Sequence, residues 1–117
     1  MAKITQGTVF MSSGDAGRPT AGFGRSTDHP IPASSGRSSY RYLKHLHPKE
    51  GGDFIAERCA TYRQPNRHII DAWRLTKEND PKDEGFLIFI DCYAGENSTQ
   101  APEGCKLDFS WFFLSLL

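Results

Sequence analysis

The sequence has no apolar run that approaches the roughly 18 residues that a membrane-spanning helix needs. Its most apolar stretch, residues 109–117, is far shorter. The N-terminal residues also lack the apolar core of a secretory signal peptide. We therefore expect a protein of the cytoplasm or another intracellular compartment, a virion included. We expect no secretion by a classical signal peptide and no membrane partner.

Cysteine is scarce, and the three cysteines present, Cys59, Cys92 and Cys105, form no C-x-x-C pair. An odd number of cysteines is a poor disulfide framework, and zinc knuckles and thioredoxin-type sites need the missing spacing. The sequence also lacks the glycine patterns that bind nucleotide phosphates and the nucleophile elbow of hydrolases. We expect reduced thiols, no cofactor and no resident metal ion.

Net charge is absent as well, because 14 basic residues balance 14 acidic ones, but the two halves of the chain differ in sign. Residues 1–50 carry a net charge of +4, and residues 51–117 carry −4. Such asymmetry can mark an arm that binds a polyanion. The alternative, which we favour, is that the two halves attract each other or attract neighbouring copies of the chain.

The chain changes character near residue 40. Residues 3–11 alternate weakly and contain β-branched side chains, which predicts one short strand. Residues 12–39 are rich in glycine, serine and proline, which predicts a long extended arm rather than a helix or a sheet interior. The sequence therefore predicts an N-terminal strand with its arm over residues 1–39 and a β-rich core domain over residues 40–117.

Residues 67–77, 86–93 and 105–117 are three runs joined by two turn-rich loops, which suggest an antiparallel meander, and residues 39–47 also predict a strand. Residues 39–47 and 105–117 alternate between the two faces of a strand, and residues 86–93 are apolar on both faces, which is typical of a central buried strand. Residues 53–63 fit either a helix capped by Asp53 or a strand, and the helix fits slightly better. We expect a mainly β fold, a small antiparallel meander, sandwich or barrel-like domain with at most one short helix, near residues 53–63. With that helix the class becomes α+β.

The sharpest local motif runs from Asp28 to Pro32 and reads Asp-His-Pro-Ile-Pro. It resembles the Asp-His-x-x-Pro opening of HNH-type nucleases over this short stretch. The resemblance implies a metal-dependent nuclease in which His29 is the general base and Asp28 a metal ligand. The chain departs from that family after the motif, because residues 40–47 predict a strand and no cysteine cradle is present. The alternative is an ordinary turn capped by Asp28.

His45 and His47 lie two residues apart, which places both imidazoles on one face of the predicted strand. The pair can hold a metal ion if a third ligand such as His68, Cys59 or Asp91 reaches it. The alternative is a solvated polar face.

Asp91 lies within the apolar run 86–93, where a carboxylate must be paired, exposed or functional. Together with Asp71 and Asp108 it would supply the oxygen ligands that a divalent cation prefers. The alternative is that Asp91 points outward or pairs with an arginine such as Arg74.

Residues 37–49 interleave basic and aromatic side chains. Basic side chains neutralise phosphates and tyrosines stack on bases, so this segment is a candidate nucleic-acid contact. The candidate residues are Arg37, Tyr40, Arg41, Tyr42, Lys44 and Lys49. The alternative is a solvent-facing amphipathic strand.

Two regions predict contacts with other chains. The arm has too few apolar residues to order itself, since fixing each backbone residue costs about 1–2 kcal/mol. The C-terminal run is apolar on both faces of its predicted strand, which is more than one small domain is expected to cover. The candidate interaction residues are Phe23, Ile31, Trp111, Phe112, Leu114 and Leu116.

These features favour a non-enzymatic structural or interaction protein. It would be a small β-rich subunit of a larger assembly, bound to other copies of itself or to other protein chains. A component of a viral or phage particle is compatible with this hypothesis. The alternative is a small nucleic-acid-binding protein or a metal-dependent HNH-like nuclease that uses Asp28 and His29.

Overall fold

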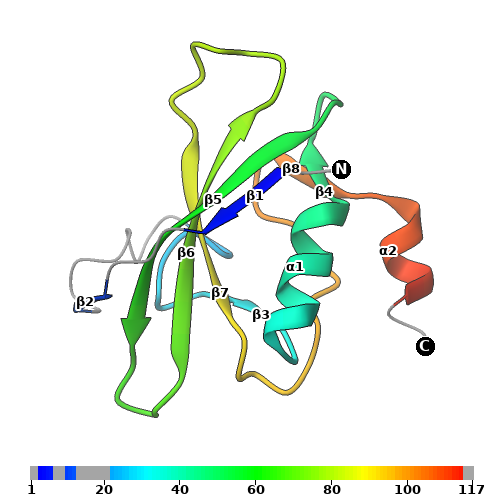
Figure 1. The fold of residues 1–117 in the computed structure, drawn as a ribbon. Coiled ribbons are helices and arrows are strands. Elements are labelled where there is room, and N and C mark those ends of the chain that lie inside the picture. Colours follow the sequence, from blue (N-terminus) through cyan, green and yellow to red (C-terminus); the bar gives the residue numbers. More distant parts are fainter. Residues whose placement is uncertain (1–2, 7–9, 13–21, 115–117) are drawn as a thin grey trace.

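The computed structural model of the chain describes residues 3–6, 10–12 and 22–114, and a mixed β-sheet dominates it (Figure 1). The strands lie in the order β1-β5-β6-β7-β3, and β2 also pairs with β5. Their bounds are β1 Lys3–Gln6, β2 Phe10–Ser12, β3 Ile31–Pro32, β5 Phe54–Arg63, β6 Ile69–Lys77 and β7 Phe86–Asp91. The predicted mainly β class is confirmed, and the sheets of the described residues are not closed into a barrel.

The predicted antiparallel meander is present, but β5, β6 and β7 form it, so that residues 54–63 take the place predicted for residues 105–117. The first turn of the meander is closed by a hydrogen bond of 2.9 Å from Gln64 N to His68 O. The loop before β7 ends at Gly85, whose φ of +75° favours glycine. A Cβ at this position would collide with Leu75 O, so the second turn depends on the missing side chain.

The N-terminal strands pair with β5 in parallel, which makes the sheet mixed. The sequence predicts one strand over residues 3–11, but β1 and β2 are separate strands that pair with residues 55–58 and 61–63 of β5. The prediction of a single strand is therefore wrong in its extent. Of the predicted arm 12–39, residues 13–21 lie outside the described residues, and the arm is followed from residue 22 onward.

β7 is the central buried strand that the run 86–93 predicts. It lies between β6 and β3, and Ile88, Phe89 and Ile90 have no exposed surface. The strand ends at Asp91, two residues earlier than predicted. The prediction of a central buried strand is confirmed. A strand that is apolar on both faces is stable only in the middle of a sheet whose two faces are both covered.

Residues 54–63 form strand β5, so of the two alternatives for residues 53–63 the strand is confirmed and the slightly favoured helix is wrong. A β-bulge shifts the register between Arg58 and Ala60: Arg58 pairs with Trp73, and Ala60 pairs with Ala72. Because neighbouring residues of β6 point to opposite faces, the bulge moves the inward side chains of β5 from one face to the other. This interruption of the two-residue period is why the segment also fits a helix.

The helix lies earlier in the chain, at α1 (Gly36–His45), where residues 39–47 predict a strand. That prediction is wrong. Ser35 caps the helix by accepting a hydrogen bond of 3.1 Å from Ser38 N. The buried residues Ser39, Tyr42 and Leu43 follow the three-and-four spacing of a helix face. After His45 the chain becomes strand β4 (Leu46–Pro48).

The C-terminal run 105–117 is a strand only at β8 (Cys105–Leu107), which pairs antiparallel with β4. It then forms a second short helix, α2 (Phe109–Leu114), and residues 115–117 lie outside the described residues. The prediction of a strand over the whole run is therefore wrong. Asp108 ends the strand by accepting a hydrogen bond of 3.2 Å from Trp111 N in the first turn of α2.

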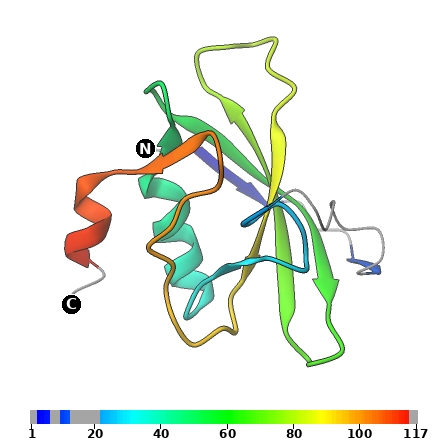
Figure 2. The same ribbon diagram turned by 180° about the vertical axis from the view of Figure 1, so that it is seen from behind.

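α1 lies between the main sheet and α2 in both ribbon views (Figures 1 and 2). The larger apolar cluster fills the space between α1 and the sheet, with Tyr42, Leu43, Trp73 and Ile88 at most 1% exposed. A smaller cluster around Phe89 lies on the other face, where the bulge has turned Ala60 and Tyr62. Neither helix is long and apolar enough to span a membrane, within the residues described.

Candidate functional site

The exposed face of α1 carries a line of positive charge. Arg37, Arg41 and Lys44 are all exposed and follow the i, i+4, i+7 spacing of one helix face. At a rise of 1.5 Å per residue, their backbones span about 10 Å along the helix axis. We call these three residues the basic face of α1. It arises because the opposite side of the same helix is buried against the sheet.

The basic face of α1 has no acidic partner within the described part of the chain, since no ion pair or hydrogen bond involves these three side chains. Two cations elsewhere in the described residues do have an acidic partner. Lys77 contacts Glu50, and Arg58 lies 3.8 Å from Asp71. The basic face of α1 therefore offers its charge to solvent or to a partner.

The tyrosines of the same segment do not share the exposed face. Tyr42 is 1% exposed and donates a hydrogen bond of 2.7 Å to Gln100 O. Burial raises its pKa far above the ordinary range. Tyr40 packs edge-on against Trp73, with 5.8 Å between the ring centroids. The structure thus separates the predicted nucleic-acid residues into an exposed set of cations, which includes Lys49, and two tyrosines that pack inward.

A cleft of ≈ 580 Å³ opens at the N-terminal end of α1. Its walls come from the segment before the helix, from β6 and from the segment after β7. The backbone bond of 2.8 Å from Ala33 N to Asp91 O holds the first of these walls against the third. The lining includes Ser34, Ser35, Ile69, Asp71, Cys92 and Tyr93.

Asp71 supplies the negative group of the cleft. Its Oδ1 atom accepts a hydrogen bond of 3.0 Å from the Thr61 hydroxyl, whereas Oδ2 has only distant neighbours, Arg58 Nη1 at 3.8 Å and Cys92 Sγ at 3.9 Å. The side chain is 15% exposed. Burial raises the pKa of Asp71, and the bond from Thr61 offsets this only in part. Asp71 is a carboxylate with one oxygen poorly satisfied.

Tyr93 supplies an aromatic ring at the rim of the cleft and is 57% exposed. Its backbone N donates a hydrogen bond of 2.8 Å to Asp91 Oδ1. The other carboxylate oxygen of Asp91 binds His68 Nδ1 at 2.6 Å, and the ring of His68 lies 6.0 Å from that of Tyr93. The ring of Tyr93 therefore has His68 as a neighbour and stays open to solvent.

Cys92 lines the cleft but is a poor nucleophile. Burial raises the pKa of its thiol, and Asp71 and Asp91 raise it further, which opposes formation of the thiolate. All three cysteines of the chain are free thiols. Covalent chemistry at Cys92 is therefore disfavoured by its surroundings.

The predicted nuclease residues lie in a tight turn before β3. Asp28 and His29 are both exposed, and Asp28 N donates a hydrogen bond of 3.2 Å to the Ser26 hydroxyl. His29 takes part in the turn through its backbone, which accepts from Gly24 N at 2.6 Å. Across the described ranges, no group of three or more histidine, cysteine or acidic side chains is placed to hold a metal ion.

His45 and His47 both contact one carboxylate, that of Asp108. Asp108 accepts hydrogen bonds from His45 Nδ1 at 2.9 Å and from His47 Nε2 at 2.8 Å. The other nitrogen of His47 lies 3.1 Å from Asp53 Oδ1. These contacts join the end of α1, strand β4 and the start of α2, which makes the cluster a structural clamp.

The three aspartates that were candidates for one cation site lie in three places. Asp71 bonds to Thr61, Asp91 bonds to His68, and Asp108 bonds to the two histidines of the clamp. Asp71 and Asp91 project from opposite faces of the sheet, since Asp71 pairs with Ile90, the neighbour of Asp91 in β7. The three aspartates therefore do not form one cation site, and Asp91 pairs with His68 rather than with an arginine such as Arg74.

The side chains of three of the six predicted interaction residues are described, and these three pack against the rest of the chain. Ile31 has no exposed surface, Trp111 is 3% exposed, and Phe23 packs against the core half-buried. The side chains of Phe112, Leu114 and Leu116 lie outside the described residues. Among the described side chains, the large apolar ones that stay exposed are Tyr93 and Phe109, at 57% and 76%.

Sequence reasoning missed the cleft, because Asp71 and Tyr93 are far apart along the chain. The available signal was the segment after the central strand, where an aromatic residue stands directly before a polar loop. Comparison of the chain with protein-family models, with curated proteins and with solved structures finds no match.

Proposed function

We propose that this chain is a non-enzymatic binding protein whose partner is a single-stranded nucleic acid. The observation that carries the proposal is the basic face of α1, three exposed cations in line without an acidic partner in the described part of the chain. Cations placed along one line neutralise successive phosphates of a nucleic-acid backbone. A net charge of zero does not oppose this, because attraction at the contact depends on the local charge.

A single strand suits the surface better than a duplex. The cleft begins where α1 begins, and Tyr93 presents an uncovered ring at its rim. Proteins that bind single strands combine a basic surface for the backbone with aromatic side chains on which unpaired bases stack. The faces of bases inside a duplex are already stacked on each other, so Tyr93 would have no use there.

The expected binding is modest and sensitive to salt. For single strands the logarithm of the binding constant falls by about 0.7 per phosphate contact for each tenfold rise in salt, so three contacts predict a slope of about −2. We expect charge reversal at Arg41 to lower the slope by about one contact or more, since reversal also repels the neighbouring phosphate.

The test measures fluorescence anisotropy of a labelled 12-nucleotide DNA strand between 25 and 300 mM NaCl, with wild type, Arg41→Glu and Lys82→Glu. Lys82 is the matched control, because it is an exposed cation on the loop between β6 and β7. We expect Arg41→Glu to weaken binding strongly and Lys82→Glu to leave it close to wild type. Equal loss in both variants, or no binding at 25 mM NaCl, would contradict the proposal.

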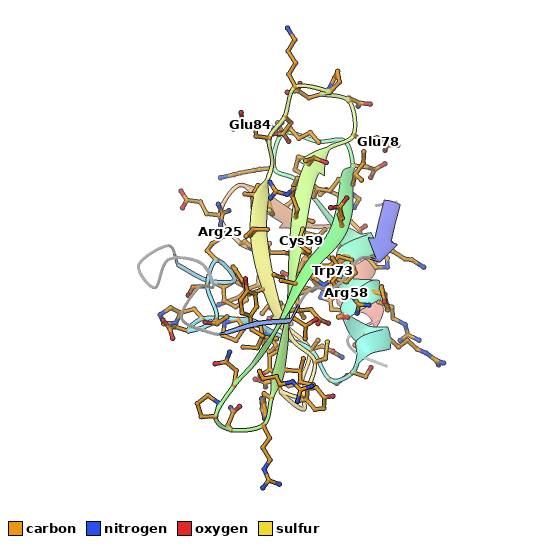
Figure 3. All side chains as sticks on the ribbon, turned by 60° about the vertical axis from the view of Figure 1, so that its left-hand side comes forward. Arg25, Arg58, Cys59, Trp73, Glu78 and Glu84 are labelled. Atoms are coloured by element: carbon orange, nitrogen blue, oxygen red, sulfur yellow. The ribbon has the colours of Figure 1, made fainter. Side chains whose placement is uncertain are left out.

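A second candidate function is that of a subunit in a larger assembly of copies of this chain. The loop between β6 and β7 is acidic, with Glu78 and Glu84 on its two sides at one end of the sheet (Figure 3). Asp80 and Asp83 belong to the same loop, and Lys82 is its only cation. This acidic loop is complementary in charge to the basic face of α1 on a neighbouring copy.

Sedimentation velocity separates the two candidates. An assembly joined in this way predicts self-association of the wild type at low salt, loss of it in Arg41→Glu, and restored association when Arg41→Glu is mixed with a loop variant in which Glu84 is replaced by lysine. A monomer at every salt concentration that still binds the DNA strand would leave the nucleic-acid function as the better one.

A further inference from the structure

We propose that the cleft beside α1 is a nucleobase subsite that prefers bases with an exocyclic amino group, such as cytosine and adenine, over thymine and uracil, which have none. This inference rests on the proposed function, because it assigns the cleft to a base of the strand whose phosphates lie on the basic face of α1. Two features of the cleft carry it: an open acceptor on one wall and an aromatic ring at the rim.

The size and composition of the cleft fit a small planar ligand. Its volume of ≈ 580 Å³ lies within the range of about 300–1,000 Å³ that is usual for ligand sites. Ile69 of β6 contributes an apolar side chain to the lining, and Ser34 and Ser35 line the cleft from the segment before α1. The hydroxyls of these two serines bond to Ser38 Oγ at 2.9 and 3.2 Å, and Asp71 is the charged acceptor of the lining.

The open acceptor is Asp71 Oδ2. A carboxylate oxygen takes up donors at 2.7–3.2 Å, but the protein groups nearest to this atom are 3.8 and 3.9 Å away. The Thr61 hydroxyl holds the other oxygen and fixes the orientation of the carboxylate. An amino group on cytosine or adenine supplies the missing donor. Thymine and uracil offer instead one N–H between two carbonyl oxygens, and those oxygens repel a carboxylate.

The aromatic ring is Tyr93, which contributes affinity without selecting a base. Stacking on an aromatic side chain is worth similar amounts for every base, since every base has a π-face. The ring of His68, which is bonded to Asp91, lies 6.0 Å from the ring of Tyr93. Asp71 therefore decides which base is preferred, and Tyr93 decides how tightly any base is held.

The experiment compares labelled dC12, dA12 and dT12 strands at 50 mM NaCl, with wild type, Asp71→Asn, Tyr93→Ala and the control Glu84→Gln. Asparagine keeps the shape of Asp71 and an oxygen for Thr61, but it places an amide donor or a weaker acceptor in the cleft. We expect the wild type to prefer dC12 and dA12 over dT12 by about five- to tenfold. Asp71→Asn should remove the preference, whereas Glu84→Gln should keep it.

Tyr93→Ala should weaken binding to all three strands by a similar factor of about ten. Salt-dependent binding with no preference among the strands, or a preference that Asp71→Asn leaves intact, would overturn the inference while the proposed function stands. If the wild type binds no strand, the proposed function fails. Titration with free cytidine and uridine then tests separately whether the cleft binds a base. Amide NMR shifts at residues 69–71 and 92–95 with cytidine alone would support the subsite; their absence would overturn it.

Discussion

An aspartate from another part of the chain lies near each end of α1. The two carboxylates differ in how many hydrogen bonds they accept. At the C-terminal end, Asp108 accepts hydrogen bonds from His45, from His47 and from the backbone of Trp111. At the N-terminal end, Asp71 has one good hydrogen bond and one oxygen with only distant neighbours. A saturated carboxylate holds elements together, whereas an unsaturated one in a cleft is available to a ligand.

The pKa values of these two carboxyl groups are shifted in opposite directions. Burial raises the pKa of Asp71, and the single bond from Thr61 does not reverse this. Partial burial also raises the pKa of Asp108, but the hydrogen bonds from His47 and His45 outweigh it, so that its pKa is lowered overall. The deeper burial of Asp71 and the larger number of donors at Asp108 together set the difference between the two ends.

The largest expected effect comes from the core that both ends share. Ile88 has no exposed surface and lies in the cluster between α1 and the sheet. Ile88→Asp places an unpaired charge there, and we expect the cost to exceed about 4 kcal/mol and to unfold the domain. Thermal unfolding followed by circular dichroism measures this, with Ile88→Val as the control that keeps the site apolar. A melting temperature of Ile88→Asp close to that of the wild type would show that the two ends do not depend on one core.

A smaller effect separates the two aspartates directly. Asp108→Asn weakens the clamp that joins α1, β4 and α2, and we expect it to lower the free energy of unfolding by about 1–2 kcal/mol. Asp71→Asn removes a poorly satisfied charge, so we expect a change within about 0.5 kcal/mol. Urea unfolding of both variants at pH 7 measures the difference. Equal losses would mean that Asp71 is as structural as Asp108.

The smallest effect is in the pH dependence of stability. Because folding lowers the pKa of Asp108, this group stabilises the fold above its unfolded pKa, and that contribution is lost as the pH falls through the lowered value. Folding raises the pKa of Asp71, so its contribution has the opposite sign and is lost as the pH rises through the raised value.

Urea unfolding between pH 3 and 7 of the wild type and both asparagine variants gives the two contributions by difference. We expect Asp108→Asn to flatten the loss of stability in acid and Asp71→Asn to steepen it. Changes of the same sign in the two variants would contradict the contrast between the ends of α1.

The central strand was predictable from the sequence, and α1 was not. The apolar pattern of the central strand is consistent with few structures, whereas the pattern of residues 39–47 is consistent with both a strand and a helix. Five consecutive apolar residues from Phe86 fit only a buried strand or a buried helix, and the flanking glycines limit the length to a strand. Residues 39–47 fit both a two-residue and a helical period. The residue that decides is Ser35, which lies before the segment and caps the helix.

The cleft depends on contacts that no local pattern contains. Asp71 and Tyr93 lie 22 positions apart and meet only because β6 and β7 pair with Asp71 opposite Ile90. The third wall of the cleft comes from residues before α1. The sequence assigned these residues to an extended arm and predicted no position for them in the fold. Composition indicated the charges of the basic face of α1, but only the helical period shows that Arg37, Arg41 and Lys44 share one face.

The parallel pairing of β1 with β5 has a consequence for synthesis on the ribosome. Lys3 lies beside Ile55, so β1 leaves the exit tunnel long before its neighbour in the sheet has been translated. At 5–20 residues per second, the interval between the two is roughly 3 to 10 seconds. During that time the nascent N-terminal strand has an open backbone edge, which is the kind of edge that other nascent chains and chaperones capture.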